Sequence, residues 1–215
     1  MNPKIKVMLV DDQEAVRAGY RGLLSGSENI EVVAEAERGE DACLAHPEVK
    51  PNVVVMELTL PGTGGLSAVR RVVNQYSPAR VLILSVHDEI AYVSRALLAG
   101  ARGYMTKNCP PELLIEAVAK VALGQKYLEP RIAHKLALHR LERAEAHSAL
   151  DALSPREFDV FSLFARGYSI QEVAEELRLG HKTAANYATL LKGKLKLGGY
   201  EDMARLADRY GLQGG

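Results

Sequence analysis

Apolar and polar positions in the first 125 residues follow two alternating periods. Short apolar runs rich in β-branched residues predict five strands. These runs cover residues 5–10, 32–34, 53–56, 81–84 and 103–105. The segments between them carry apolar residues at helical spacing and predict five helices, at 14–24, 40–46, 66–76, 89–99 and 111–123. This alternation predicts an α/β fold: a doubly wound, flavodoxin-like (βα)5 parallel sheet covered by helices on both faces.

The strand pattern stops near Gln125. Residues 126–150 are charged and rich in alanine, and the apolar residues Ile132, Leu136 and Leu141 lie at rough helical spacing after Pro130. We interpret 126–150 as a helical linker that follows a domain at 1–125. The pattern leaves open whether the linker is a solvated spacer or a helix that dimerises.

A separate all-α domain is predicted over 151–215. Ser154 and Glu157 form a capping box with Pro155 at the first helical position, and Ser169 and Glu172 form a second box. Gly180 and the Gly198-Gly199 pair then precede two further helices, at about 181–195 and 201–210. Four short helices joined by tight turns are typical of a helix-turn-helix domain.

Composition narrows the classes of protein. Hydrophobic residues make up 47% of the chain, and no apolar run approaches the roughly 18 residues of a membrane helix. The N-terminus does not read as a signal peptide, so we expect a cytoplasmic protein without a membrane partner. Cys43 and Cys109 do not form a disulfide framework, and His134 and His139 are spaced too far apart to share a helix face as metal ligands.

Net charge limits the mode of nucleic-acid binding. The chain carries 27 basic and 27 acidic residues, and region 151–215 is itself balanced. A neutral domain lacks the general electrostatic attraction that basic domains have for nucleic acid. Any DNA binding therefore depends on where individual charges are placed.

Five polar residues directly follow predicted strands: Asp11, Asp12, Glu57, Ser85 and Lys107. Ligands of open parallel sheets bind at the carboxyl ends of the strands. Two adjacent carboxylates repel each other unless a cation lies between them, so the aspartate pair indicates a possible Mg²⁺ site. Ser85 and Lys107 would then hold an anion beside the metal. The alternative is that Asp11 caps a helix and Lys107 is a surface residue.

With these residues in place, residues 4–124 resemble the receiver domains of response regulators. The matching segments are 7–12, 56–62, 81–85 and 100–107. The resemblance implies that Asp11, Asp12 and the backbone carbonyl of Thr59 bind Mg²⁺, if the metal is still bound. It also implies that Ser85 and Lys107 contact a phosphoryl group and that Tyr104 is an aromatic switch.

Glu57 departs from this family. It occupies the phosphoacceptor position, where the family has aspartate. The extra methylene moves the carboxylate by about 1.5 Å, and a displacement of about 1 Å can slow a positioned reaction roughly 100-fold. We therefore expect weak phosphorylation or none. Three interpretations remain: Glu57 imitates the phosphorylated state, the pocket is vestigial, or the protein is still phosphorylated.

Residues 153–212 resemble the LuxR/NarL-type helix-turn-helix through 153–157, 167–174 and 182–183. The whole layout resembles NarL/FixJ-type response regulators, and the segments 16–19, 39–42, 64–66 and 124–127 resemble the GacA/UvrY-like branch. The resemblance implies a DNA-binding transcription regulator of a two-component system. Such a protein acts as a homodimer on promoter half-sites, with a possible sensor kinase or second regulator as partner.

The helix at 181–195 is the expected recognition helix, whose N-terminal residues reach base edges in the major groove. Candidate DNA contacts are Lys182, Thr183, Asn186, Tyr187, Lys192, Lys194 and Lys196. Asn186 can pair bidentately with adenine, and the lysines can hold phosphates. Ala184 and Ala185 replace residues that are usual in the family. We therefore expect weak binding by one domain, and dimerisation on two half-sites.

One competing function remains open. Glu57, Ala185 and the neutral C-terminal domain favour a degenerate regulator that pairs with another regulator or kinase without binding DNA itself. The two capping boxes and the retained Lys182, Thr183 and Asn186 favour DNA binding. An enzyme, such as a phosphatase that uses Asp11 and Asp12, is not expected because nothing supplies its nucleophile.

Overall fold

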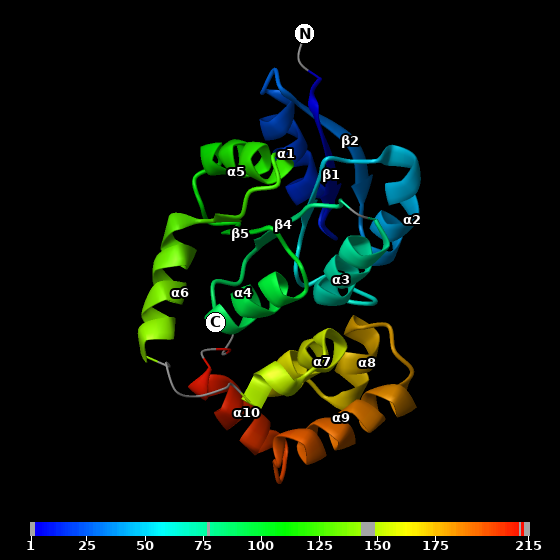
Figure 1. The fold of residues 1–215 in the computed structure, drawn as a ribbon. Coiled ribbons are helices and arrows are strands. Elements are labelled where there is room, and N and C mark those ends of the chain that lie inside the picture. The colour runs from blue at the N-terminus through cyan, green and yellow to red at the C-terminus, as the bar shows by residue number, and fades with distance from the viewer. Residues whose placement is uncertain (1–2, 77, 143–148, 211, 213–215) are drawn as a thin grey trace.

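The structure is a computed structural model that describes residues 3–76, 78–142, 149–210 and 212. An α/β domain with a central sheet lies above a smaller helical domain, and a long helix runs between them along one side (Figure 1). The two domains pack directly on each other, because one hydrophobic cluster contains residues of both.

The sheet has six parallel strands in the order β2-β1-β3-β4-β5-β6. The strands are β1 (Ile5–Val10), β2 (Ile30–Ala36), β3 (Val53–Met56), β4 (Val81–Ser85), β5 (Gly103–Thr106) and β6 (Tyr127–Leu128). Five of them confirm the predicted units. The edge strand β2 is longer than predicted. The prediction was too short because Glu31 and Glu35 interrupt the apolar pattern near the two ends of the strand. The two-residue β6 was not predicted, since it is too short to show a period.

Helices cover both faces of the sheet, as predicted. The receiver-like half contains α1 (Glu14–Ser25), α2 (Gly39–Val49), α3 (Gly65–Gln75), α4 (Ile90–Leu98) and α5 (Glu112–Ala122). Leu24 of α1 and Val118 of α5 belong to one buried cluster, and Val69 of α3 and Val93 of α4 to the other. Strand order reverses between β1 and β3, which opens a crevice at their carboxyl ends.

The linker is attached to the sheet. After β6 it continues as α6 (Pro130–Glu142) and a short 3-10 turn, η1 (Ala149–Ala152). The buried carboxylate of Glu129 accepts hydrogen bonds of 2.8 Å from the Thr106 backbone N–H and hydroxyl at the end of β5. Asp88, just after β4, pairs with Arg131 at 3.1 Å and with Lys135 at 2.6 Å. These contacts correct the expectation that the strand pattern ends before the linker; residues 143–148 of the expected helix lie outside the described residues.

The C-terminal domain consists of α7 (Pro155–Ala165), α8 (Ile170–Glu176), α9 (His181–Leu195) and α10 (Tyr200–Arg209). Both predicted capping boxes are present: Ser154 with Glu157 begins α7, and Ser169 with Glu172 begins α8. Each box satisfies backbone N–H groups that the first helical turn leaves unpaired. The predicted four-helix unit is therefore confirmed.

Helix α7 forms the contact with the receiver-like domain. Tyr92 of α4 meets Phe158 edge to face, with ring centroids 5.4 Å apart. The guanidinium of Arg95 lies over the same phenyl ring at 5.1 Å and donates to the Leu153 carbonyl. A Cβ at Gly64 would overlap the Asp159 carboxylate, so glycine allows this close approach. Helix α9 lies on the side of its domain that faces away from the receiver (Figure 1).

Candidate functional site

The carboxyl edge of the sheet brings the expected polar residues together. Asp11 follows β1, Glu57 follows β3, Ser85 ends β4 and Lys107 follows β5. Ser85 is fully buried and Glu57 is 3% exposed. An ionised group with so little solvent contact needs close partners.

Glu57 finds these partners on both carboxylate oxygens. Its Oε1 accepts hydrogen bonds from the Ser85 hydroxyl at 2.6 Å and the Leu58 backbone N–H at 2.6 Å. The Thr59 backbone N–H and hydroxyl add longer bonds to this oxygen, at 3.1 and 3.3 Å. Oε2 lies 2.7 Å from the Lys107 ammonium. The longer acid thus reaches the two side chains that the family resemblance assigns to a phosphoryl group.

Lys107 bridges two carboxylates. Its ammonium lies 2.5 Å from Asp11 Oδ2 as well as 2.7 Å from Glu57 Oε2. Burial acts to lower the pKa of Lys107, but the charge of Glu57 and the hydrogen bonds to Asp11 and Glu57 outweigh it, so the pKa is raised. Lys107 is therefore a cation held between two anions.

Asp12 is more exposed than its neighbour. Partial burial and the adjacent charge of Asp11 raise the pKa of Asp12. Among the described residues, the ion pairs of Lys107 are with Asp11 and Glu57 and not with Asp12. Thr59 joins this network through its backbone N–H and hydroxyl, which both donate to Glu57.

These residues do not fit a metal ion in the arrangement seen here. Within the ranges that the structure describes, no group of three or more His, Cys, Asp or Glu residues is placed to hold one. The Lys107 ammonium neutralises Asp11 and Glu57 directly, and this removes the repulsion that suggested a cation site from the sequence.

Tyr104 points inward. Its side chain is fully buried, and its hydroxyl donates a 2.9 Å hydrogen bond to the His87 carbonyl. Burial, followed by the nearby charge of Glu57, raises the pKa of Tyr104 well above its ordinary value. The phenol is therefore a neutral donor at physiological pH.

A chain of rings leads from this hydroxyl to the second domain. The His87 ring stacks on Tyr92 with centroids 4.2 Å apart, and Tyr92 meets Phe158 of α7. Neither His87 nor Tyr92 was predicted from the sequence. His87 could have been found because it lies two residues after the end of β4, but Tyr92 is one apolar position among several on α4.

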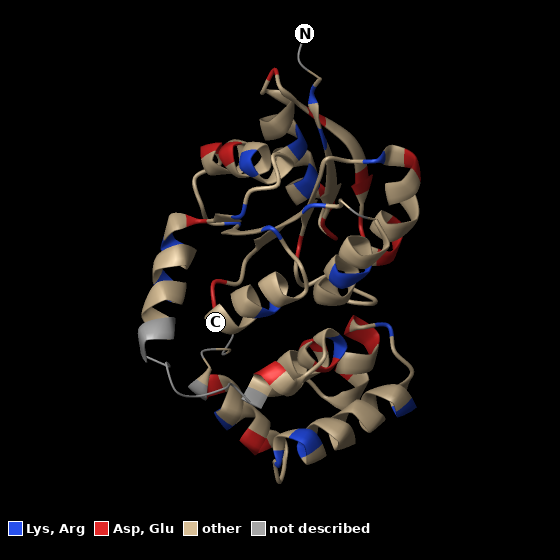
Figure 2. Cartoon of the chain, viewed as in Figure 1, with Lys and Arg blue, Asp and Glu red and all other residues tan. Residues whose placement is uncertain are grey.

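The second candidate surface is α9. Ala184, Ala188 and Leu191 are buried and hold this helix on its domain, while Lys182, Thr183 and Asn186 are exposed. Tyr187 and Lys192 are half-buried. Basic residues lie at both ends of the helix (Figure 2). The expected base-contacting and phosphate-contacting residues therefore share one accessible helix.

The three lysines at the end of α9 have different surroundings. Lys194 pairs with Glu157 at 2.8 Å. Burial acts to raise the pKa of Glu157, but the hydrogen bonds to Lys194 and Ser154 lower it overall. Lys192 lies over the Tyr200 ring at 5.4 Å, and Lys196 is exposed at the left-handed C-cap. Lys194 thus already holds α9 against α7, which leaves Lys192 and Lys196 as the stronger candidates for phosphate contacts.

Within the described ranges, no helix is long and apolar enough to cross a membrane. The longest helix in the part of the chain that the structure describes, α9, has 15 residues and carries three lysines.

Two family models match the chain. The response regulator receiver domain matches residues 7–119, and the family of bacterial regulatory proteins called luxR matches residues 151–207. Among curated proteins, the response regulator GacA of Pseudomonas aeruginosa is 36% identical over 208 residues, which cover 97% of each chain. The response regulator UvrY of Escherichia coli is also 36% identical, over 97% of this chain and 95% of its own.

Solved structures agree. A LuxR-family two-component response regulator from Aurantimonas is 39% identical over 64% of this chain and 99% of its own, with a TM-score of 0.62. The response regulator ChrA of a heme-sensing two-component system is 31% identical over 97% of this chain and 98% of its own, with a TM-score of 0.55. RcsB of Salmonella typhimurium, at 23% identity and a TM-score of 0.70, shares the fold. The chain belongs to the response regulators and is a DNA-binding transcription regulator with an N-terminal receiver domain and a C-terminal domain of the luxR family.

Proposed function

We propose that this regulator binds promoter DNA as a homodimer through α9, while Glu57 holds its receiver in the arrangement that phosphorylation produces in typical family members. The proposal assigns residues 1–125 to the receiver, with β6 added to its sheet, 126–150 to the linker and 151–215 to DNA binding. It places the protein in the cytoplasm, where it reaches the chromosome. A sensor kinase is then not required for activity.

One observation carries the receiver part of this proposal. The Glu57 carboxylate contacts both Ser85 and Lys107 while Tyr104 is buried. Each charge-assisted contact contributes about 1.5–3 kcal/mol. Inverting a two-state equilibrium from 1:99 to 99:1 takes about 5.5 kcal/mol. Two such contacts, made in this arrangement and absent from the resting one, amount to about 3–6 kcal/mol, which is of the size needed to shift the receiver strongly.

The same contacts oppose phosphoryl transfer. Glu57 is bonded to Ser85, Lys107 and the backbone of Leu58, so it occupies the positions that would receive a phosphoryl group. Lys107 also neutralises Asp11, so the charges of this pocket are balanced by a side chain of the protein. Receiver domains in general bind Mg²⁺ at this place; in this chain we propose that the lysine replaces it.

We expect acetyl phosphate to leave the wild-type protein unmodified, whether or not Mg²⁺ is present. The displaced carboxylate cannot meet the phosphorus in line, and its oxygens already have partners. Intact-mass spectrometry after treatment measures the modification directly. The matched control is Glu57→Asp, whose shorter side chain draws the carboxylate back from Ser85 and Lys107. This variant is expected to gain the mass of one phosphoryl group if the other pocket residues keep their positions. A stoichiometric gain in the wild type that Glu57→Gln abolishes would contradict the proposal.

DNA recognition is assigned to the exposed start of α9. We expect Asn186→Ala to weaken binding to a selected site by about 1–3 kcal/mol and to relax preference at one base pair, because a bidentate contact is lost. Lys182→Ala is expected to weaken binding to all sequences alike. It should also reduce the slope of the logarithm of the binding constant against the logarithm of the salt concentration by about one. Fluorescence anisotropy titrations at several salt concentrations separate these two results.

The control for the DNA experiment is Lys194→Gln. Its ammonium is paired with Glu157, so this change is expected to alter the salt dependence less than Lys182→Ala does. If the full-length dimer ignores every selected DNA at low salt, the alternative applies: a regulator that acts by pairing with another regulator or kinase. The neutral charge of the C-terminal region is the observation that favours this alternative.

A further inference from the structure

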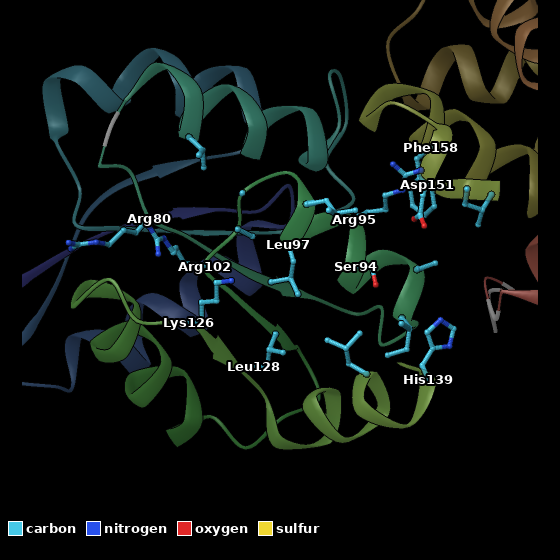
Figure 3. A pocket seen from close by; sticks show the side chains of 18 of the residues that line it. Arg80, Ser94, Arg95, Leu97, Arg102, Lys126, Leu128, His139, Asp151 and Phe158 are labelled. Carbon is cyan, nitrogen blue, oxygen red and sulfur yellow. The ribbon is translucent and has the colours of Figure 1, made fainter. Parts of the chain in front are cut away.

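A groove of about 910 Å³ lies where the receiver, the linker and the DNA-binding domain meet. Its walls come from α4, from the segments that flank β5 and β6, from α6 and from the start of α7 (Figure 3). Small-molecule sites have volumes of about 300–1,000 Å³ and favour the junctions between domains. The groove is separate from the Glu57 pocket, none of whose residues line it.

One end of this groove is strongly basic. Arg80, Arg102 and Lys126 lie together there in Figure 3. Arg80 donates to the Ala122 carbonyl and Arg102 donates to the Gly124 carbonyl at 3.3 Å, at the end of α5. A guanidinium has five N–H donors, so each arginine keeps further donors. In the described ranges, none of the three cations lies within ion-pair distance of a carboxylate.

The rest of the groove is mainly apolar. Leu97 and Leu128 lie in its middle (Figure 3), and Leu98 contributes a side chain that is 72% exposed. Among the described lining residues, four carry a positive charge and Asp151 supplies the carboxylate, next to Phe158 at the other end. An anionic head with an apolar tail matches this distribution, because the head meets the three cations and the tail covers the leucines.

We infer that this groove is a binding site for an amphipathic carboxylate of medium length, with its head at Arg80, Arg102 and Lys126 and its tail along Leu97, Leu98 and Leu128. Its walls come from both domains and the linker, so a bound molecule stabilises their closed arrangement by mass action. This stabilisation by a bound molecule does not involve Glu57, which does not line the groove.

Sodium decanoate below its micellar concentration is the probe. Isothermal titration calorimetry on the full chain is expected to show saturable 1:1 binding. Decanol, which lacks the charge, and acetate, which lacks the tail, are expected to bind at least about 10-fold more weakly, because each loses one set of contacts. Backbone amide shifts in α4 should follow the same saturation curve.

Two pairs of variants test the residues. Arg102→Gln with Lys126→Gln is expected to weaken decanoate binding at least about 10-fold. Its control, Arg21→Gln with Lys4→Gln, removes two exposed cations outside the groove and should leave the dissociation constant unchanged. Leu98→Gln is expected to weaken binding about 3- to 10-fold. Its control is Leu123→Gln, since Leu123 is equally exposed, at 75%, and does not line the groove.

Circular dichroism of each variant shows that a loss of binding is not a loss of fold. The inference is overturned if decanoate shows no saturable binding, if decanol binds as well as decanoate, or if the groove variants and their controls bind alike. It is also overturned if an acidic peptide, and not decanoate, saturates the groove.

Discussion

Glu57→Gln is expected to weaken DNA binding and dimerisation by about 10- to 150-fold relative to the wild type. The change keeps the shape of the side chain but removes the charge that faces Lys107. Lys107 then keeps Asp11 as its ion-pair partner, and the uncharged amide holds Ser85 less strongly. Loss of one charge-assisted contact corresponds to about 1.5–3 kcal/mol, which gives this range of dissociation constants.

Sedimentation equilibrium and DNA titration measure the two effects. Tyr104 should turn outward in the variant. Quenchers dissolved in the solvent should then reduce the tyrosine fluorescence more than they do in the wild type. The matched control is Glu48→Gln, which removes an exposed carboxylate from α2. If the pocket is vestigial, the free energies of dimerisation and DNA binding should change by no more than a few tenths of a kcal/mol. Identical curves for wild type and Glu57→Gln would remove the support for phosphate imitation.

Asp159→Asn is expected to stabilise the protein at neutral pH by an amount that grows with pH. The Asp159 Oδ2 atom is buried at the contact between the domains and has no hydrogen-bond partner among the described residues. Burial raises the pKa of this carboxyl to about 8, although Arg156 and Arg95 act to lower it. The folded protein therefore carries a protonated Asp159 at neutral pH.

The direction of the pH effect follows from proton linkage. Below about pH 4 both the folded and the unfolded states bind this proton, and Asp159 has no effect on their balance. Between about pH 4 and pH 8 only the folded state binds it, so stability falls as pH rises, by up to about 1.4 kcal/mol per pH unit. Asparagine does not titrate and lacks this dependence. The advantage of the variant should grow by about 2–3 kcal/mol from pH 5 to pH 7.

Urea unfolding of the full chain at both pH values measures this difference. Asp208→Asn is the control, because Asp208 is an exposed acid of α10 in the same domain. Parallel stability curves for the wild type and Asp159→Asn would show that the carboxyl ionises normally and that the domain contact does not bury it.

Much of the fold could be predicted because its signals are local. The apolar runs of β3 and β4 mark buried parallel strands whatever the rest of the chain does. The capping boxes at Ser154 and Ser169 depend on residues three positions apart. The edge that holds Asp11, Glu57, Ser85 and Lys107 follows from strand direction alone, since the carboxyl ends of parallel strands meet.

Other features were decided by contacts between distant segments. The two-residue β6 exists because Tyr127 and Leu128 pair with β5 and because Glu129 binds Thr106. No local pattern could show this, since two residues have no period. Lys194 is a predicted phosphate contact, and only the packing of α7 shows that its ammonium is paired with Glu157.

The sequence by itself determined which chemical groups meet at the receiver edge and that the acid there is one methylene longer than the family's. Only the tertiary structure decided that Lys107 bridges Glu57 and Asp11, that Tyr104 lies inward and that the buried Oδ2 atom of Asp159 lies against Gly64. The physical reason is that strand order sets the position of a backbone, whereas the partner of a long side chain depends on packing from several elements at once.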